Sequence, residues 1–404
     1  MANVSSSNGL EKRPKLRFPG FDEPWKSKPF SSLYKYVNEK NDGSFSVDSI
    51  ISVANMYFKP DARITDMEYL KTYNIFKLGD IAFEGNMSKD FSFGRFVENT
   101  IGDGIVSHVF VVFRPINNFH NFDYWKYAIN NENVMGRILA RCTKKTTMMT
   151  NLVTTDFLTQ KIYCPSLEEQ AHIASFLSLI DQRIRKQKEL LNALKKYKRG
   201  VVQQVFSERN ENKRTRYPEW KLSSLGEYFT EQTIRTSNSS ATPLVSLTVE
   251  NGITPKTERY YREFLVTKEG DNYKAIKPGW FAYNPMNAHL GAIAPNHLGY
   301  TAAVSGYYNI FSVNEIDTVD FWEEYLTSYP MLIHYKLIAT GSLIEKQRVH
   351  YSQFVGIRRK LPSLEERKHL SKIFQALNAK ITNAESMEHQ LIKLRTSLLQ
   401  QLFI

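Results

Sequence analysis

The sequence predicts an α+β protein in which two β-rich globular units alternate with two long helices. The pentapeptide "PSLEE" occurs at residues 165–169 and again at 362–366, and about forty residues with a helical pattern of apolar side chains follow each copy. Short runs of β-branched and aromatic residues bounded by glycine and asparagine precede each copy, and such runs are typical of strands.

Each pentapeptide contains a helix-starting signal. Ser166 is followed three residues later by Glu169, and Ser363 by Glu366. In such a capping box the serine oxygen accepts a hydrogen bond from a first-turn N–H, and the glutamate reaches back to the N–H of the serine. The proline before each serine favours an extended approach. We therefore expect a helix to begin at each pentapeptide.

The two helical segments are copies of each other. At a constant offset of 197, residues 165–206 align with 362–403 without a gap, and 12 of these 42 positions are identical. Apolar residues recur at steps of three and four, which predicts a seam along which the helices pack as an antiparallel coiled coil. The seam residues expected to face each other are Ile173, Leu177, Ile180 and Ile184 on the first helix, and Leu370, Phe374, Leu377 and Ile381 on the second.

The repeat extends beyond the helices and defines the domain organisation. The stretch "KLRFPGFDEPW" near the start is echoed by "RTRYPEW" after the first helix. We expect a first globular unit over 1–160, a long helix over 161–209, a second unit over 210–358 and a second helix over 359–404. This order predicts an internal repeat with pseudo-two-fold symmetry.

Composition excludes several classes of protein. No apolar run approaches the roughly eighteen residues of a membrane span, and the first twenty residues lack the apolar stretch of a signal peptide, so we expect a cytoplasmic protein with no membrane contact. With only Cys142 and Cys164, neither a disulfide framework nor a cysteine-rich zinc site is available. The nine histidines show no metal-ligand spacing, so no metal site is predicted.

The net charge of +12 and the pI near 9.3 favour a polyanionic partner. Basic residues alternate with aromatic ones at 257–264, and two basic loops, 141–147 and 341–350, occupy equivalent places before the two helices. For any single stretch, a solvated basic face is the alternative interpretation. The candidates for DNA contact are Lys89, Arg95, Arg141, Lys144, Lys145, Arg259, Tyr261, Arg262, Lys274, Lys346 and Arg348.

No catalytic signature is present. The sequence lacks GxxxxGK[ST] and also GxGxxG after a strand. The stretch "NPMN" at 284–287 is similar to the Asn-Pro-Pro-aromatic motif of amino-methyltransferases, but it lacks the second proline and the aromatic residue that would stack on a flipped base. We therefore predict no catalytic residues and no cofactor in this chain, and a binding or scaffolding role.

The duplicated plan resembles the specificity subunit of bacterial type I restriction-modification enzymes. The resemblance spans the chain, and it depends on "LRFPGF" with its following tryptophan and on "PSLEEQAHIASFLSLIDQRI" paired with "PSLEERKHLSKIFQALNAKI". The second copy departs from the more usual "EEQAH" with "EERKH". In that family each globular unit is a target recognition domain that reads one half of a bipartite, asymmetric DNA target, and the helices set the spacing.

The resemblance also implies the partners. They would be double-stranded DNA, methyltransferase subunits, two of which are expected to dock on the helices, and restriction or translocase subunits attached through the methyltransferases. S-adenosylmethionine, ATP and Mg are then expected in those partner subunits of the endonuclease and adenine-specific methyltransferase complex.

Two other functions compete with this interpretation. A coiled-coil adaptor that binds only protein would explain the helices and the absence of catalytic motifs, but it would not explain the matching basic loops. A stand-alone DNA methyltransferase or nuclease would explain the charge, but it would need the cofactor loop that the sequence lacks.

Overall fold

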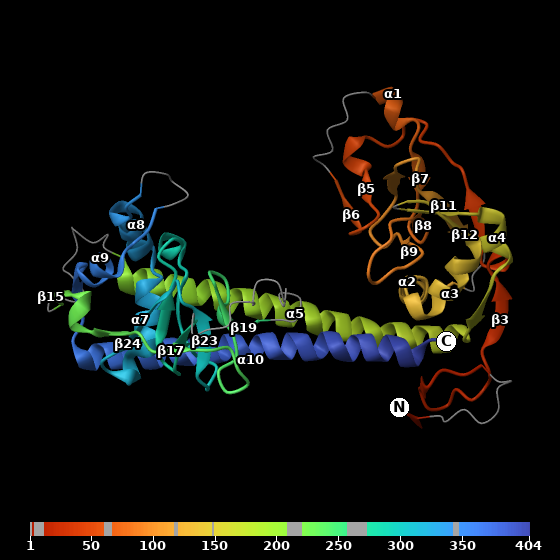
Figure 1. The fold of residues 1–404 in the computed structure, drawn as a ribbon. Coiled ribbons are helices and arrows are strands. Elements are labelled where there is room, and N and C mark those ends of the chain that lie inside the picture. Colours follow the sequence, from red (N-terminus) through yellow and green to blue (C-terminus); the bar gives the residue numbers. More distant parts are fainter. Residues whose placement is uncertain are drawn as a thin grey trace. The chain divides into compact units, whose positions relative to one another are not determined.

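The computed structural model describes residues 2–3, 12–59, 67–116, 120–147, 149–207, 220–256, 273–341 and 347–404. The chain divides into two compact units. Unit 1 comprises Met1–Lys188 with Met387–Ile404, and unit 2 comprises Glu189–Ser386. Each unit therefore contains one globular part and one end of each long helix (Figure 1).

Unit 1 is built on a four-stranded antiparallel sheet with the strand order β4-β11-β8-β9. Two-stranded ladders and short helices surround this sheet. The strands are β1 (Ala2–Asn3), β2 (Leu16–Arg17), β3 (Lys26–Pro29), β4 (Tyr34–Val37), β5 (Ile51–Ser52), β6 (Tyr57–Phe58), β7 (Asn74–Phe76), β8 (Ile81–Glu84), β9 (Arg95–Glu98), β10 (Gly104–Val106), β11 (Val111–Pro115), β12 (Thr143–Lys145), β13 (Thr150–Leu152) and β14 (Lys161–Cys164). The short helices are η1 (Phe30–Ser32), η2 (Val47–Ser49), α1 (Met67–Leu70), α2 (Phe122–Ala128), α3 (Glu132–Cys142) and α4 (Thr154–Thr159), and the long helix α5 (Leu167–Phe206) begins in this unit.

Unit 2 repeats this plan. Its four-stranded sheet has the order β16-β24-β21-β22, and the pair β15-β25 corresponds to β3-β14. The strands are β15 (Lys221–Ser224), β16 (Phe229–Gln232), β17 (Arg235–Thr236), β18 (Val245–Thr248), β19 (Gly252–Pro255), β20 (Tyr273–Ile276), β21 (Phe281–Tyr283), β22 (Ile293–Pro295), β23 (Ala302–Ser305), β24 (Asn309–Val313) and β25 (Arg358–Leu361). The short helices are η3 (Leu225–Glu227), η5 (Ala288–Leu290), η6 (Ile316–Thr318), α7 (Val319–Leu326), α8 (Tyr329–Ile338) and α9 (Tyr351–Val355), and the long helix α10 (Leu364–Leu402) begins in this unit.

A buried asparagine closes the same loop in each unit. Asn99 donates from Nδ2 to the carbonyls of Phe76 (2.9 Å) and Gly102 (2.8 Å). Asn296, 197 residues later, donates to the carbonyls of Ile276 (2.8 Å) and Tyr300 (2.9 Å). Both side chains are 1% exposed, so their amides satisfy backbone groups that burial would otherwise leave unpaired.

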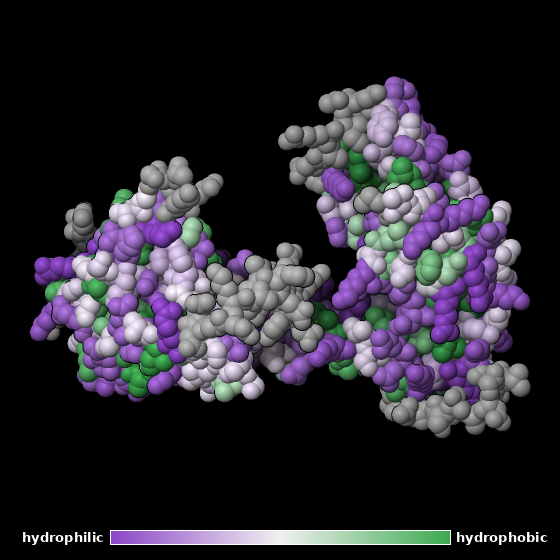
Figure 2. Space-filling model, in the orientation of Figure 1, coloured by the Kyte–Doolittle hydropathy of each residue, from purple (hydrophilic) through white to green (hydrophobic). Residues whose placement is uncertain are grey.

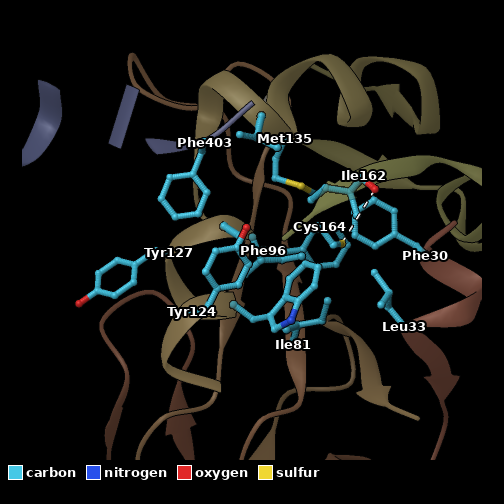
Figure 3. Close-up of a cluster of buried hydrophobic side chains, with 14 of the residues drawn as sticks. Phe30, Leu33, Ile81, Phe96, Tyr124, Tyr127, Met135, Ile162, Cys164 and Phe403 are labelled. Carbon is cyan, nitrogen blue, oxygen red and sulfur yellow. Dashed lines mark hydrogen bonds between the residues drawn. The ribbon is translucent and has the colours of Figure 1, made fainter. Parts of the chain in front are cut away.

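Aromatic residues dominate the main core of each unit, and one end of a long helix completes each core. In unit 1, Phe403 after α10 stacks on Tyr124 at a ring separation of 5.4 Å (Figure 3). In unit 2, Phe206 at the end of α5 contacts Phe321 and Phe374 at 5.7 and 6.0 Å. The phenylalanines that end the two aligned segments therefore have equivalent roles.

The two long helices begin at the predicted serines, but the glutamates act differently from the prediction. The Glu169 N–H donates to Ser166 Oγ (3.2 Å) and the Glu366 N–H to Ser363 Oγ (3.3 Å). Within the described residues neither glutamate side chain returns to its serine, so this half of the predicted capping box is wrong. Instead, each carboxylate accepts a hydrogen bond from a tryptophan indole, from Trp25 or Trp220.

Along each long helix, buried or half-buried positions recur at alternating steps of three and four residues. On α5 they are Ile173, Leu177, Ile180, Ile184, Gln187, Leu191, Leu194, Lys198, Val201 and Val205. On α10 they are Arg367, Leu370, Phe374, Leu377, Ile381, Ala384, Glu388, Leu391, Arg395, Leu398 and Leu402. This spacing keeps one face of a helix against its neighbours.

The predicted pairing within the seam is corrected. The first group does not face the second, because Ile173 and Leu177 belong to the core of unit 1 with Leu398 and Leu402, whereas Leu370 and Phe374 belong to the core of unit 2 with Phe206. Ile180 packs against the first core, and Ile184, Leu377 and Ile381 are partly exposed. The reason is direction: within each unit, the start of one helix lies beside the end of the other.

A polar network joins both helix segments to the globular part of each unit. In unit 1, Tyr127 donates to Asp181 Oδ2 (2.8 Å), and Arg395 Nε donates to Asp181 Oδ1 (2.5 Å). At the positions 197 residues away, unit 2 has Glu324, Asn378 and Lys198, where Lys198 Nζ lies 2.5 Å from Glu324 Oε1. The two units therefore use the same three positions for this network but place different side chains there.

The face drawn in Figure 2 is mostly hydrophilic, and apolar residues form small areas on it. Over the described part of the chain, no helix combines the length and the apolar character that crossing a membrane requires.

Candidate nucleic-acid interface

The predicted basic loop of unit 1 forms a β-hairpin between α3 and α4. β12 pairs with β13 in the register Lys144↔Asn151 and Lys145↔Thr150. Thr146 closes the turn, since its N–H and its hydroxyl donate to the Met149 carbonyl at 2.8 and 2.7 Å. We call residues 143–152 the unit 1 hairpin.

The unit 1 hairpin is fixed against the loop that joins β8 to β9. The Thr150 N–H donates to the Gly85 carbonyl (2.8 Å), and its hydroxyl donates to the Phe93 carbonyl (2.9 Å). A Cβ atom at Gly85 would lie 2.2 Å from the Thr150 carbonyl oxygen, so this approach requires glycine. The hairpin is therefore a positioned element of the unit.

Four of the predicted DNA-contacting residues of unit 1 are exposed around this hairpin. Arg141 lies in the last turn of α3, Lys144 and Lys145 lie on β12, and Lys89 lies in the β8–β9 loop. Exposed asparagines accompany them at 86 and 151. Lysines suit phosphate contacts, whereas asparagine amides can pair with base edges, so the surface carries both kinds of group.

Arg95 is engaged within the protein. Its Nε donates to Glu84 Oε2 (2.7 Å), its Nη2 donates to the Ala54 carbonyl (3.0 Å), and its guanidinium lies 5.1 Å from the Phe91 ring. The side chain is 24% exposed. Arg95 thus ties the β5–β6 turn to the β8–β9 loop, a role that its place in the sequence did not reveal.

Unit 2 has a corresponding arrangement after α8. Thr340 and Arg348 exchange backbone hydrogen bonds of 2.9 Å, and the Val349 N–H donates to the Pro285 carbonyl (3.0 Å). The exposed Arg348 guanidinium lies 5.4 Å from the Tyr307 ring. The other predicted residues here, Lys346, Arg259, Tyr261 and Arg262, lie outside the described residues.

Lys274 also has a partner inside its unit. Its Nζ donates to the Tyr308 carbonyl (2.7 Å), and burial lowers the pKa of its ammonium group. In unit 1, Asn74 Nδ2 makes the equivalent bond to the Phe110 carbonyl (3.0 Å). Because a neutral amide serves the same purpose in the other unit, Lys274 has a structural role here.

The sequence prediction overlooked the β5–β6 turn. Arg95 holds this turn beside the β8–β9 loop, and the next strand carries the exposed aromatic residues Tyr57 (49%) and Phe58 (37%), followed by the exposed Lys59. The sequence signal for this turn is the aromatic-aromatic-basic triplet at 57–59, the same combination of residue types that occurs within residues 257–264.

The stretch 284–287 forms a closed turn. Asn284 Oδ1 accepts from the Met286 N–H (3.1 Å), and the Asn284 N–H donates to the Ala292 carbonyl (3.0 Å). Its amide therefore serves the turn itself, and the prediction of no catalytic residues stays a prediction.

Comparisons with known proteins agree with this architecture. Residues 27–196 match the family described as type I restriction modification DNA specificity domain. The structure of a type I restriction-modification system S subunit from M. genitalium aligns with a TM-score of 0.58 at 15% identity, covering 97% of this chain and 99% of that one.

A second structure, from a study of complex assembly and conformational transition of the type I restriction-modification system, aligns with a TM-score of 0.54 at 14% identity and covers 96% and 99% of the two chains. No curated protein sequence matches the chain. Residues 27–196 are thus similar to a type I restriction modification DNA specificity domain, and the chain has, over nearly its whole length, the fold of these two structures.

Proposed function

We propose that this chain is the sequence-specific DNA-binding subunit of a type I restriction-modification complex, and that each unit reads one half of a bipartite, asymmetric target. The observation that carries the proposal is the repeated strand order with a basic element at the same place in each unit, in a chain of net charge +12. Because the two units differ in side chains, the two half-sites need not be alike.

Each unit would contact DNA through the loops at one end of its sheet. In unit 1 these are the unit 1 hairpin, the β8–β9 loop and the β5–β6 turn. A two-stranded ribbon is narrow enough to enter the major groove. Lys144, Lys145, Arg141 and Lys89 would contact phosphates, Arg348 would do so in unit 2, and the fixed position of the hairpin would hold neighbouring polar groups against base edges.

The long helices would act as a spacer that also docks the methyltransferase subunits. The alternating spacing of shielded residues on α5 and α10 supports an antiparallel coiled coil, as do the ion pairs Asp181–Arg395 in unit 1 and Lys195–Glu385 in unit 2. Two methyltransferase subunits would bind, and restriction subunits would attach through them. S-adenosylmethionine, ATP and Mg would then be bound by those partners, and this chain would be non-catalytic.

The direct test exchanges one unit. The complex of this chain with its methyltransferase partner would be compared with a chimera in which residues 15–150 come from another specificity subunit, and methylated sites would be mapped by sequencing. We expect one half-site to change and the other to remain. If both halves change together, or if neither complex selects a sequence, the proposal is wrong; the second result is the one that a protein adaptor would give.

Spacing can be tested separately with matched insertions. Seven residues added to each helix, after Lys188 in α5 and after Ser386 in α10, preserve the alternation of three and four and lengthen the spacer by about 10 Å. That length corresponds to roughly three base pairs at about 3.4 Å each. We expect the same half-sites with a longer gap. The control adds seven residues to α5 alone, which should abolish assembly, and an unchanged gap with matched insertions would contradict the spacer role.

A further inference from the structure

Unit 2 contains a cluster of potential metal ligands away from the loops assigned to DNA. One ligand atom each from His297, Asp320 and Glu323 lie within 4.8 Å of one another. They line the wall of a groove of about 2110 Å³, and the His297 side chain is 54% exposed, so a cation could reach them from solvent.

The backbone holds these three residues in place. His297 lies between Asn296, whose amide closes the buried loop, and Leu298, whose N–H donates to Asn296 Oδ1 (2.9 Å). Asp320 and Glu323 are three residues apart on α7, so they share a helix face. His297 Nε2 lies 2.9 Å from Glu323 Oε2. Because these side chains lie on fixed elements, binding an ion would require little rearrangement of the ligands.

Two of the lysines that line this groove are paired with other carboxylates. Lys198 is engaged by the neighbouring Glu324 at 2.5 Å, and Lys195 is engaged by Glu385 at 2.7 Å. The neutral amide of Asn378 hydrogen-bonds to both Asp320 and Glu324. A bound cation would offset the negative charge of the Asp320 and Glu323 carboxylates.

The equivalent positions in unit 1 reach neutrality differently. Offset by 197, they are Thr100, Asp123 and Lys126, and Lys126 Nζ pairs with Asp123 Oδ1 at 2.8 Å. Unit 2 keeps the aspartate, replaces the lysine with Glu323 and adds the imidazole of His297. The same fold thus accommodates both sets, and at these positions unit 2 offers an imidazole and two carboxylates where unit 1 offers one carboxylate.

We propose that His297, Asp320 and Glu323 bind a divalent transition-metal ion through one imidazole nitrogen and two carboxylate oxygens. This donor set suits Zn²⁺, Co²⁺ or Mn²⁺. The ion would fasten the loop after β22 to α7. Sequence spacing predicted no metal site because His297 lies more than twenty residues before its partners, and the fold alone brings them together.

The test uses untagged full-length chain titrated with Co²⁺ and followed by visible absorption, with Zn²⁺ competition to confirm the site. We expect one equivalent to bind and the thermal midpoint to rise on binding. His297→Ala and Glu323→Gln should each weaken binding at least tenfold. His289→Ala removes a histidine of the same unit outside the cluster and should leave binding unchanged.

Two results would overturn the proposal: no saturable Co²⁺ binding by the wild-type chain, which would leave His297 and Glu323 as an ion pair only, or one-equivalent binding that survives the double substitution of His297 and Glu323. Circular dichroism of each variant separates lost binding from lost folding. If a variant does not fold, the Glu323→Lys variant, which recreates the unit 1 residue at this position, should fold and show no saturable binding.

Discussion

The two units start their long helices with the same five residues but connect these starts to the globular parts differently. In unit 1, Glu169 is 1% exposed and accepts two hydrogen bonds of 2.8 Å from Arg17 and one from Trp25. In unit 2, Glu366 is partly exposed, and Trp220 donates to both of its oxygens at 3.2 Å. The same sequence signal is therefore part of a buried ion pair in one unit and of a modest hydrogen bond in the other.

The cores of the two units differ in which polar side chains they bury. The core of unit 1 includes Tyr34, Glu98 and His120 near Trp125, and no hydrogen-bond partner for the polar atoms of these side chains lies among the described residues. The corresponding positions in unit 2 are Phe229, Pro295 and Asp317. Unit 2 builds the same sheet with other residues at these three positions, so the fold does not require their polar groups. The unit 2 core has its own buried polar atoms, Trp322 Nε1 and Tyr335 Oη, for which no hydrogen-bond partner lies among the described residues.

The largest expected difference follows from the helix starts. Glu169→Ala leaves the Arg17 guanidinium, which is 5% exposed, without its charge partner, and we expect a loss of about 3–5 kcal/mol of unfolding free energy. Glu366→Ala removes only the indole bond and should cost about 1 kcal/mol. Urea unfolding of both variants measures the contrast.

Arg17→Met combined with Glu169→Leu is the matched control, since replacing a buried pair by apolar residues of similar volume is often close to neutral. Equal losses from the two single substitutions would show that the ion pair of unit 1 adds nothing to its helix start.

Glu98 makes the stability of unit 1 depend on pH. Burial raises its pKa to about 9, so between its unfolded value and about 9 the unfolded chain releases a proton that the folded chain keeps. Stability therefore falls as pH rises, by about 1.4 kcal/mol per unit. Burial also lowers the pKa of His120 to about 4, so His120 titrates below pH 7, and the clean window is pH 7 to 8.5.

Glu98→Gln keeps the shape and cannot ionise, so over this window it should gain about 2 kcal/mol relative to the wild type. Parallel pH curves for the two proteins would contradict a protonated Glu98. Glu84→Gln in the same sheet is a control, because its carboxylate already has Arg95 as a partner.

Sequence reasoning succeeded where one local signal decides the structure. The serine caps and the two long helices depend on neighbouring residues and on periodicity, and both were predicted. The glutamate contacts were not, because Trp25 lies 144 residues from Glu169 and no local pattern indicates such a partner. The prediction of which seam residues face each other was wrong for a related reason. The alternation of apolar residues identifies the buried face of a helix, whereas the relative direction of two helices decides which residues of the second helix this face meets.

The candidate interface shows the same limit. The repeat in the sequence predicted a basic loop before each long helix. In unit 1 this loop is part of a β-hairpin. Arg95 and Lys274 had the same basic character in the sequence, yet each is bound to a carbonyl of its own unit. Charge composition cannot distinguish a residue that faces solvent from one that joins two loops.

The polar networks at the helices predict a smaller difference. The Asp181–Arg395 pair is 36–37% exposed on both sides and also receives the Tyr127 hydroxyl, so Arg395→Ala should cost about 1 kcal/mol. Lys195→Ala breaks a pair that is nearly half exposed on both sides and should cost about 0–0.5 kcal/mol. Denaturant midpoints at low and high salt measure both, and a larger loss at Lys195 would reverse the comparison.

The smallest effect concerns binding and contrasts two lysines of unit 1. Lys144 lies on the unit 1 hairpin, whereas Lys161 is an exposed lysine on β14 outside the proposed interface. If Lys144 neutralises one phosphate, Lys144→Ala should weaken binding of the assembled methyltransferase complex a few-fold for all DNA sequences and lower the slope of log affinity against log salt by roughly 1. Lys161→Ala should change neither quantity. A changed preference for one base with an unchanged slope would instead place Lys144 on a base edge, and no change at all would remove the hairpin from the interface.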